Sequence, residues 1–255
     1  MTRRAVPVAA RAARHAAVLL AAAVLLAGCA GAAGIPDGGD GAAPAPGPPM
    51  GEATAAPPAA RSSGPAAAIP AADRAAGVLG RTVPQSGPGK TVVVPGRGAP
   101  PPGRSRTVAV RVEVERGVPV DGVAFAGFVT GVLADPRSWG GDGSVGFART
   151  DGPAPLRIVL ATPASADRLC RPLDTVGKLS CRNGDRVVLN LERWVTGVPD
   201  YAGDLTGYRR YLVNHEVGHW LGHQHEACPG PGRPAPVMQQ QTLGLDGCAR
   251  NGWPR

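Results

Sequence analysis

The chain of 255 residues lacks several features that would point to common protein classes. Its apolar stretch near the N-terminus, residues 16–27, is shorter than the about 20 residues that a membrane-spanning helix needs. No pair of cysteines has the C-x₂-C spacing that seeds a four-cysteine zinc site. There is no internal repeat, and no run of basic residues is interleaved with aromatic ones. These absences argue against a repeat architecture, a four-cysteine zinc site and a nucleic-acid partner.

The positive charge is unevenly distributed. The net charge is +8, but residues 1–28 hold four arginines and no acid, so residues 29–255 carry 23 basic and 19 acidic residues. Residues 78–255 carry 21 basic and 15 acidic residues, and most of the basic ones are single, scattered arginines. We interpret the isoelectric point near 9.9 as favouring attraction to an anionic cell envelope rather than to nucleic acid.

The first 28 residues are typical of an export signal. A positive segment precedes the apolar stretch, with arginines at Arg3, Arg4, Arg11 and Arg14. The following Leu26-Ala27-Gly28-Cys29 resembles the lipobox of bacterial lipoproteins. This resemblance implies that cleavage leaves a lipid-modified Cys29, which anchors the protein to the outer face of the cytoplasmic membrane in the cell envelope. An ordinary cleaved signal and an uncleaved anchor with a free Cys29 thiol are the alternatives.

Residues 29–77 are almost entirely alanine, glycine, proline and small polar residues. Such a composition buries too little apolar surface to offset the entropy of ordering, so we expect a disordered tether. A flexible coil over residues 30–77 has a reach of roughly 40 Å. A pro-segment is the alternative, but a cysteine switch needs a free upstream thiol. Cys29 is the only candidate for that thiol, and lipid modification would remove it from this role. We therefore expect one monomeric domain over residues 78–255, with its core in residues 104–255.

Four cysteines remain in that domain. An even number in an exported domain favours two disulfides over a metal site. Of the three possible connectivities, Cys170 with Cys181 and Cys228 with Cys248 closes the shortest loops, and we expect this pairing. Each disulfide contributes roughly 3 kcal/mol to stability in the chain-entropy model.

The hydrophobic pattern of the domain predicts an α+β order. Alternation indicates a strand at residues 106–115. Residues 144–149 and 156–161 are typical of short strands, and residues 91–94 of a further strand at the domain edge. Residues 121–134 are typical of a helix that Asp135-Pro136 ends. Asn183-Gly184 favours a tight turn, which predicts a hairpin between residues 178–181 and 186–191.

The run HEVGHWLGHQH at residues 215–225 fits the pattern H-E-x-x-H-x-x-G-x-x-H without a gap, and it holds four of the five histidines. We expect a helix with Asp204 as its N-cap, which places His215 and His219 one turn apart on one face. Two such imidazoles can bind one Zn²⁺ ion at about 2 Å. Glu216 lies about 100° further round the helix, so it can act as the base beside the metal.

Gly222 decides which histidine completes the site. A continued helix would bring His223 in line with the first two ligands, whereas a tetrahedral ion needs its third ligand from off that line. A glycine at the helix end can adopt the left-handed conformation and turn the chain. We therefore expect one Zn²⁺ per chain, held by His215, His219 and His225, with His223 outside the ligand set.

This run resembles the signature of the metzincin clan of zinc metallopeptidases. The resemblance implies an α+β fold in which a small twisted mixed sheet packs on the active-site helix and a methionine turn lies beneath the metal. Met238, the only methionine outside the signal and tether, fits that turn. Only 17 residues follow Met238, so we expect a short C-terminal segment. Glu226 directly follows the third histidine, as a glutamate does in the astacin branch of the clan. That branch also has a tyrosine near the methionine turn, but no tyrosine follows Met238, so we expect no tyrosine ligand.

The wider pattern from YRRYLVNHEVGH to APVMQQQT resembles an uncharacterised family of exported bacterial metzincin-like proteins and lipoproteins, which implies no substrate. We expect a membrane-tethered zinc endopeptidase that acts on a peptide or protein outside the cytoplasm, with Glu216 as general base. A zinc hydrolase of another amide, such as one in peptidoglycan, is an alternative. A zinc-stabilised binding lipoprotein without activity is another, although a purely structural site has no use for Glu216.

Overall fold

The computed structural model describes residues 68–254. The predicted signal peptide, Cys29 and the tether as far as residue 67 lie outside these residues. Within the described part of the chain, none of the helices combines the length and the apolar character that crossing a membrane requires.

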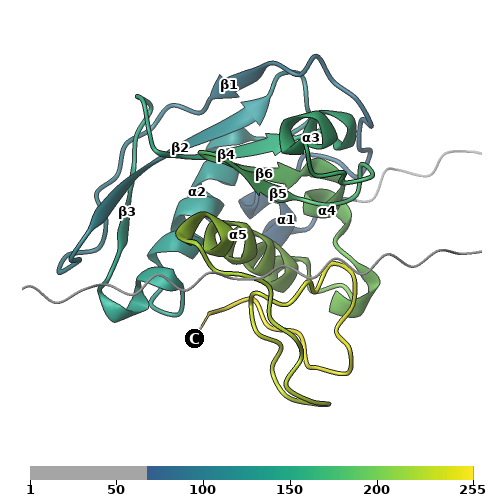
Figure 1. The fold of residues 1–255 in the computed structure, drawn as a ribbon. Helices are drawn as coiled ribbons and strands as arrows, with labels where there is room; N and C mark the ends of the chain where they lie inside the picture. Colours follow the sequence, from purple (N-terminus) through teal and green to yellow (C-terminus); the bar gives the residue numbers. More distant parts are fainter. Residues whose placement is uncertain (1–67, 255) are drawn as a thin grey trace, which may run out of the picture. The chain divides into compact units, whose positions relative to one another are not determined.

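Six strands form one twisted mixed sheet in the order β1-β2-β4-β6-β5, with β3 also paired to β2 (Figure 1). The central pairs β2 to β4 and β4 to β6 are parallel, whereas β1 and β5 are antiparallel to their neighbours. The bounds are β1 Thr91–Val93, β2 Thr107–Glu115, β3 Gly146–Arg149, β4 Leu156–Ala161, β5 Cys181–Asn183 and β6 Arg186–Asn190. The predicted strands, including the edge strand and the hairpin, are confirmed within a few residues.

Helices cover both faces of this sheet. On β4, Ile158 and Leu160 belong to the large core, which α2 (Gly122–Ala134) and α5 (Leu205–Leu221) also supply. The alternate residues Val159 and Ala161 belong to a smaller cluster that includes residues of α3 (Pro163–Cys170). Figure 1 shows α3 on one side of the sheet, with α2 and α5 on the other. Burial on both faces explains why β4 is apolar without interruption over residues 158–161.

The tether predicted up to residue 77 ends earlier than expected, because the described part includes helix α1 (Ala71–Ala75). Asp73 of α1 is buried, and its carboxylate lies 2.7 Å from the guanidinium of the fully buried Arg209 on α5. The indole nitrogen of Trp194 donates to the carbonyl oxygen of Ala76 at 2.9 Å. These partners are distant in sequence, so local composition could not indicate them.

Two further helices were not predicted from the sequence. The first is α3, which the proline at its first position and a short polar sequence made hard to recognise. The second is α4 (Leu191–Thr196), which begins where the predicted strand was expected to end; the side chain of Asn190 caps it by accepting a hydrogen bond from the backbone N–H of Glu192. Short 3₁₀ turns lie at Trp139–Asp142 and Pro199–Tyr201.

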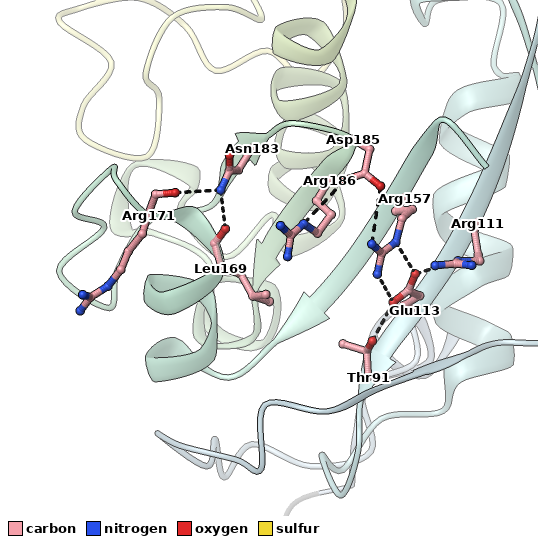
Figure 2. A network of polar contacts seen from close by, with 9 residues as sticks. All are labelled: Thr91, Arg111, Glu113, Arg157, Leu169, Arg171, Asn183, Asp185 and Arg186. Carbon is pink, nitrogen blue, oxygen red and sulfur yellow. Dashed lines mark hydrogen bonds and ion pairs between the residues drawn. The ribbon is translucent and has the colours of Figure 1, made fainter. Parts of the chain in front are cut away.

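A polar network ties three strands together on the α3 side of the sheet (Figure 2). Glu113 of β2 is 2 % exposed and accepts hydrogen bonds from Arg111, from Arg157 of β4 and from Thr91 of β1. Burial by itself raises the pKa of Glu113, but the hydrogen bonds from Arg157, Thr91 and Arg111 outweigh it and lower the pKa to about 2. The carboxylate therefore stays ionised inside the sheet.

The segment after α5 has no helix or extended strand among its described residues, 222–254. Both predicted disulfides are present, Cys170–Cys181 between α3 and β5 and Cys228–Cys248 within this C-terminal segment. The second disulfide encloses Met238. In place of secondary structure, this segment is held by a covalent link and by contacts with α5.

Candidate metal centre

Helix α5 positions the motif, and both of its ends follow the sequence prediction. Asp204 caps the start, where its carboxylate accepts a hydrogen bond from the backbone N–H of Gly207 at 2.8 Å. Gly222 ends the helix with a φ of 102°, in the left-handed region that favours glycine. The backbone N–H of His223 then donates to the carbonyl oxygen of Gly218, which closes the last turn.

The turn at Gly222 separates the two histidines that compete for the third position. The imidazole of His225 returns to α5, so that one ligand nitrogen from each of His215, His219 and His225 lies within 4.8 Å of the others. The imidazole of His223 instead stacks on Trp139 with ring centroids 4.2 Å apart. The chain therefore brings together the three predicted histidines and directs His223 elsewhere.

Backbone carbonyl groups hold two of the three imidazoles in a suitable orientation. The Nδ1 atom of His215 lies 2.8 Å from the carbonyl oxygen of Val237, and that of His219 lies 3.0 Å from the carbonyl oxygen of His223. A carbonyl oxygen can only accept, so each Nδ1 carries the proton. Each Nε2 atom then keeps its lone pair for a metal. His223 thus contributes through its backbone.

Burial favours the neutral form of all three imidazoles. It lowers the pKa of His215 to about 3 and also lowers the pKa values of His219 and His225. For His219, the positive charge of Arg182 on β5 acts in the same direction. A neutral imidazole is the form that binds a metal ion, so these residues need little reorganisation to act as ligands.

Glu216 is a buried carboxyl group with an unsatisfied oxygen. It is 5 % exposed, and its Oε2 atom has no hydrogen-bond partner among the described residues. Burial raises its pKa to about 8. An unpaired buried polar atom is costly, and beside three neutral imidazoles it indicates a missing partner such as a cation with its water. Three imidazoles with one adjacent carboxylate suit a four-coordinate zinc ion that keeps one open position.

Met238 lies against the helix that carries the motif. It is fully buried, and a Cβ atom added at Gly218 would overlap both its Sδ atom and the indole ring of Trp139. Gly218 is therefore a point of close approach between α5 and the segment that carries Met238. Sequence reasoning missed Gly218 and Trp139. A glycine inside a helix, where it costs about 1 kcal/mol relative to alanine, was the available signal for the first.

A cavity of about 350 Å³ opens over the three histidines and Glu216. Tyr211, one turn before His215, lines this cavity and is otherwise buried, as are Tyr201 and Tyr208. All three tyrosines belong to the large core. The edge strand β5 lines another part of the cavity through Cys181 and Arg182.

The sequence of the domain matches a known protein family. A family described as "Protein of unknown function (DUF3152)" matches residues 78–251, about two thirds of the chain. No curated protein and no solved structure matches the chain. The match covers every strand of the sheet, the motif helix α5, both disulfides and Met238.

Proposed function

Since the chain belongs to the DUF3152 family, whose description names no activity, we propose its function from the site: it is a zinc-dependent metallopeptidase of the metzincin type. The observation that carries this proposal is the combination of three neutral imidazoles within 4.8 Å of one another and the unsatisfied carboxyl oxygen of Glu216 beside them. A purely structural zinc site has four protein ligands and no need for a buried carboxylate.

The roles of the residues follow from this geometry. His215, His219 and His225 would hold the zinc ion, which would supply a Lewis acid at the centre of the site. Glu216 takes the proton of the attacking water and returns it to the leaving amine. To act as a base it must be ionised, although burial alone raises its pKa to about 8. A neighbouring divalent cation favours the carboxylate form and offsets this effect.

The edge of the sheet favours a peptide over another amide as the substrate. Strand β5 ends the sheet, and its outer backbone groups have no strand partner within residues 68–254. Because β5 also lines the cavity, an extended peptide can pair with it and pass over the three histidines. Backbone pairing of this kind requires regularly spaced amide groups, which a peptide supplies.

The two disulfides fit an oxidising compartment outside the cytoplasm. We propose that the protein is exported and anchored by a lipid on Cys29. Metabolic labelling with a fatty acid, followed by membrane fractionation of the natural chain and of Cys29→Ser, tests the anchor. Labelled protein in the membrane fraction for the natural chain alone supports it. Unlabelled protein released into the medium from both would contradict it.

The proposed activity is tested on four forms of the chain: the natural one, Glu216→Gln, His225→Ala and His223→Ala. We expect one zinc per chain except in His225→Ala, and cleavage of a peptide library only by the natural chain and His223→Ala. His223→Ala is the matched control, because His223 belongs to the same run but lies outside the ligand set. Zinc without cleavage by any form would indicate a binding protein or a hydrolase of a different amide. Absence of zinc from the natural chain would rule out the site.

A further inference from the structure

Arg182 is the cationic residue of the candidate cleft. Among the Arg and Lys residues in the described part of the chain, it alone lines the cavity over the three histidines. The cavity has one acidic residue in its lining, Glu216, which is almost fully buried. Much of the remaining lining is uncharged, with leucines at 173, 179 and 243 and polar residues such as Gln240 and Thr242.

The register of the sheet directs Arg182 into this cleft. Arg182 pairs with Val187 across the antiparallel β5 and β6 strands, and paired residues project from the same face. Val187 belongs to the large core on the α5 side. The preceding residue, Cys181, pairs with Val188 and faces the α3 side, where it forms the disulfide with Cys170. The disulfide thereby fixes the strand with Arg182 on the side of the histidines.

The guanidinium of Arg182 has no acidic partner within residues 68–254, in contrast to three other arginines of the sheet. Arg111 and Arg157 pair with Glu113, and Arg186 pairs with Asp185. Arg182 is exposed, and none of the described acidic residues forms an ion pair with it. It lines the same cavity as His219 and His225. An unpaired guanidinium beside the reaction centre, in a cavity whose only acid is buried, attracts anionic groups.

We propose that Arg182 determines substrate selection by binding a carboxylate of the peptide near the bond to be cleaved. This inference rests on the proposed peptidase function. The guanidinium presents a planar fork of donors that suits a carboxylate in two parallel hydrogen bonds. Two sources of this group fit the chemistry, an aspartate or glutamate side chain and the C-terminal carboxylate of a short peptide.

The test compares four forms of the full chain: natural, Arg182→Lys, Arg182→Ala and Arg182→Glu. Arg116→Glu is the matched control, because it is also an exposed arginine and produces the same change in net charge outside the cavity. The substrates are peptides that differ only in having Glu, Gln or Lys at positions next to the scissile bond. Each peptide is used with a free and with an amidated C-terminus.

For the natural chain we expect kcat/KM to be about tenfold higher for peptides with a carboxylate, which is the worth of one charge-assisted hydrogen bond. The preference should weaken with added salt. It should survive in part in Arg182→Lys, disappear in Arg182→Ala and turn towards Lys peptides in Arg182→Glu. Arg116→Glu should behave as the natural chain. A preference confined to free C-termini would support the proposal and identify the chain end as the carboxylate source.

Binding gives a readout that does not depend on turnover. The same peptides, carrying a hydroxamate in place of the scissile amide, are titrated into each zinc-loaded form. Hydroxamates that bind without any preference for a carboxylate would overturn this inference and leave the zinc site standing. An equal loss of turnover for all peptides in Arg182→Ala would also overturn it, because Arg182 would then act in the reaction itself. Failure of zinc and all hydroxamates to bind would overturn the proposed function together with this inference.

Discussion

The Nδ1 atom of His215 lies 2.8 Å from the carbonyl oxygen of Val237, the residue directly before Met238. One short segment therefore performs two tasks, since it orients a candidate metal ligand through its backbone and packs a fully buried methionine against the same helix. The Cys228–Cys248 disulfide encloses this segment, which has no regular secondary structure of its own. The geometry of the candidate site thus depends on how closely the segment approaches α5.

Gly218→Ala tests that approach. The added Cβ atom would overlap Met238 and Trp139, so we expect the free energy of unfolding to fall by about 1–3 kcal/mol and the zinc affinity to fall with it. Gly131→Ala on α2 is the control, because a Cβ atom there meets nothing within 4 Å. That substitution should raise stability by about 0.5–1 kcal/mol. Denaturant unfolding and zinc titration measure both effects, and equal stabilisation by the two substitutions would contradict the packing argument.

Asp73→Asn tests whether helix α1 is part of the folded domain. The change removes the charged partner of Arg209, which is fully buried, and an uncompensated buried charge costs about 3–5 kcal/mol. Asp151→Asn is the matched control, since Asp151 pairs with Arg97 at 3.0 Å on the surface, where such a pair contributes about 0–1 kcal/mol. Denaturant unfolding should therefore separate the two substitutions clearly. A chain that begins at residue 78 should lose stability as Asp73→Asn does.

Much of the fold could be predicted because its signals are local. The alternation of β2, the Asn183-Gly184 turn and the caps of α5 each depend on neighbouring residues, and the structure has these elements where the sequence indicates them. The spacing of the motif likewise predicted that His215 and His219 lie close together, because an α-helix repeats every 3.6 residues. Sequence spacing also predicted both disulfides.

The parts that sequence reasoning missed depend on distant partners. Helix α1 packs on the domain through a contact between Asp73 and Arg209, which lies 136 positions later in the chain. The local composition, rich in alanine and glycine, gives no sign of this contact. The orientation of Arg182 depends on strand register, which a three-residue strand does not encode by itself. The Val237 carbonyl contributes through its backbone, so its residue type carries no signal.

Replacing both cysteines of one disulfide by serine should distinguish the two loops. Each replacement should lower the free energy of unfolding by about 3 kcal/mol in the chain-entropy model. Loss of Cys228–Cys248 should also weaken zinc binding, because that loop supplies the Val237 carbonyl and Met238. Loss of Cys170–Cys181 should leave zinc affinity nearly unchanged, because its loop contributes no histidine. Equal zinc affinities in both variants would show that the enclosed segment does not position His215.

The Glu113 network predicts how stability depends on pH. The pKa of Glu113 is lowered from 4.5 to about 2 in the folded chain, so the folded state favours its ionised form. The resulting stabilisation is fully present above about pH 4.5, the pKa in the unfolded chain, and is lost as the pH falls towards 2. At about 1.4 kcal/mol per pKa unit, its upper limit is about 3.5 kcal/mol.

Glu113→Gln isolates this contribution from those of other acidic residues with lowered pKa values, such as Glu115 and Asp135, which act with the same sign. We expect the free energy of unfolding of the natural chain to decrease more steeply than that of Glu113→Gln between pH 5 and pH 2, as measured by denaturant unfolding at each pH. The two curves should converge only below about pH 2, where Glu113 is protonated in both states. Parallel curves across this range would mean that Arg157 and Arg111 do not hold the carboxylate in its ionised form.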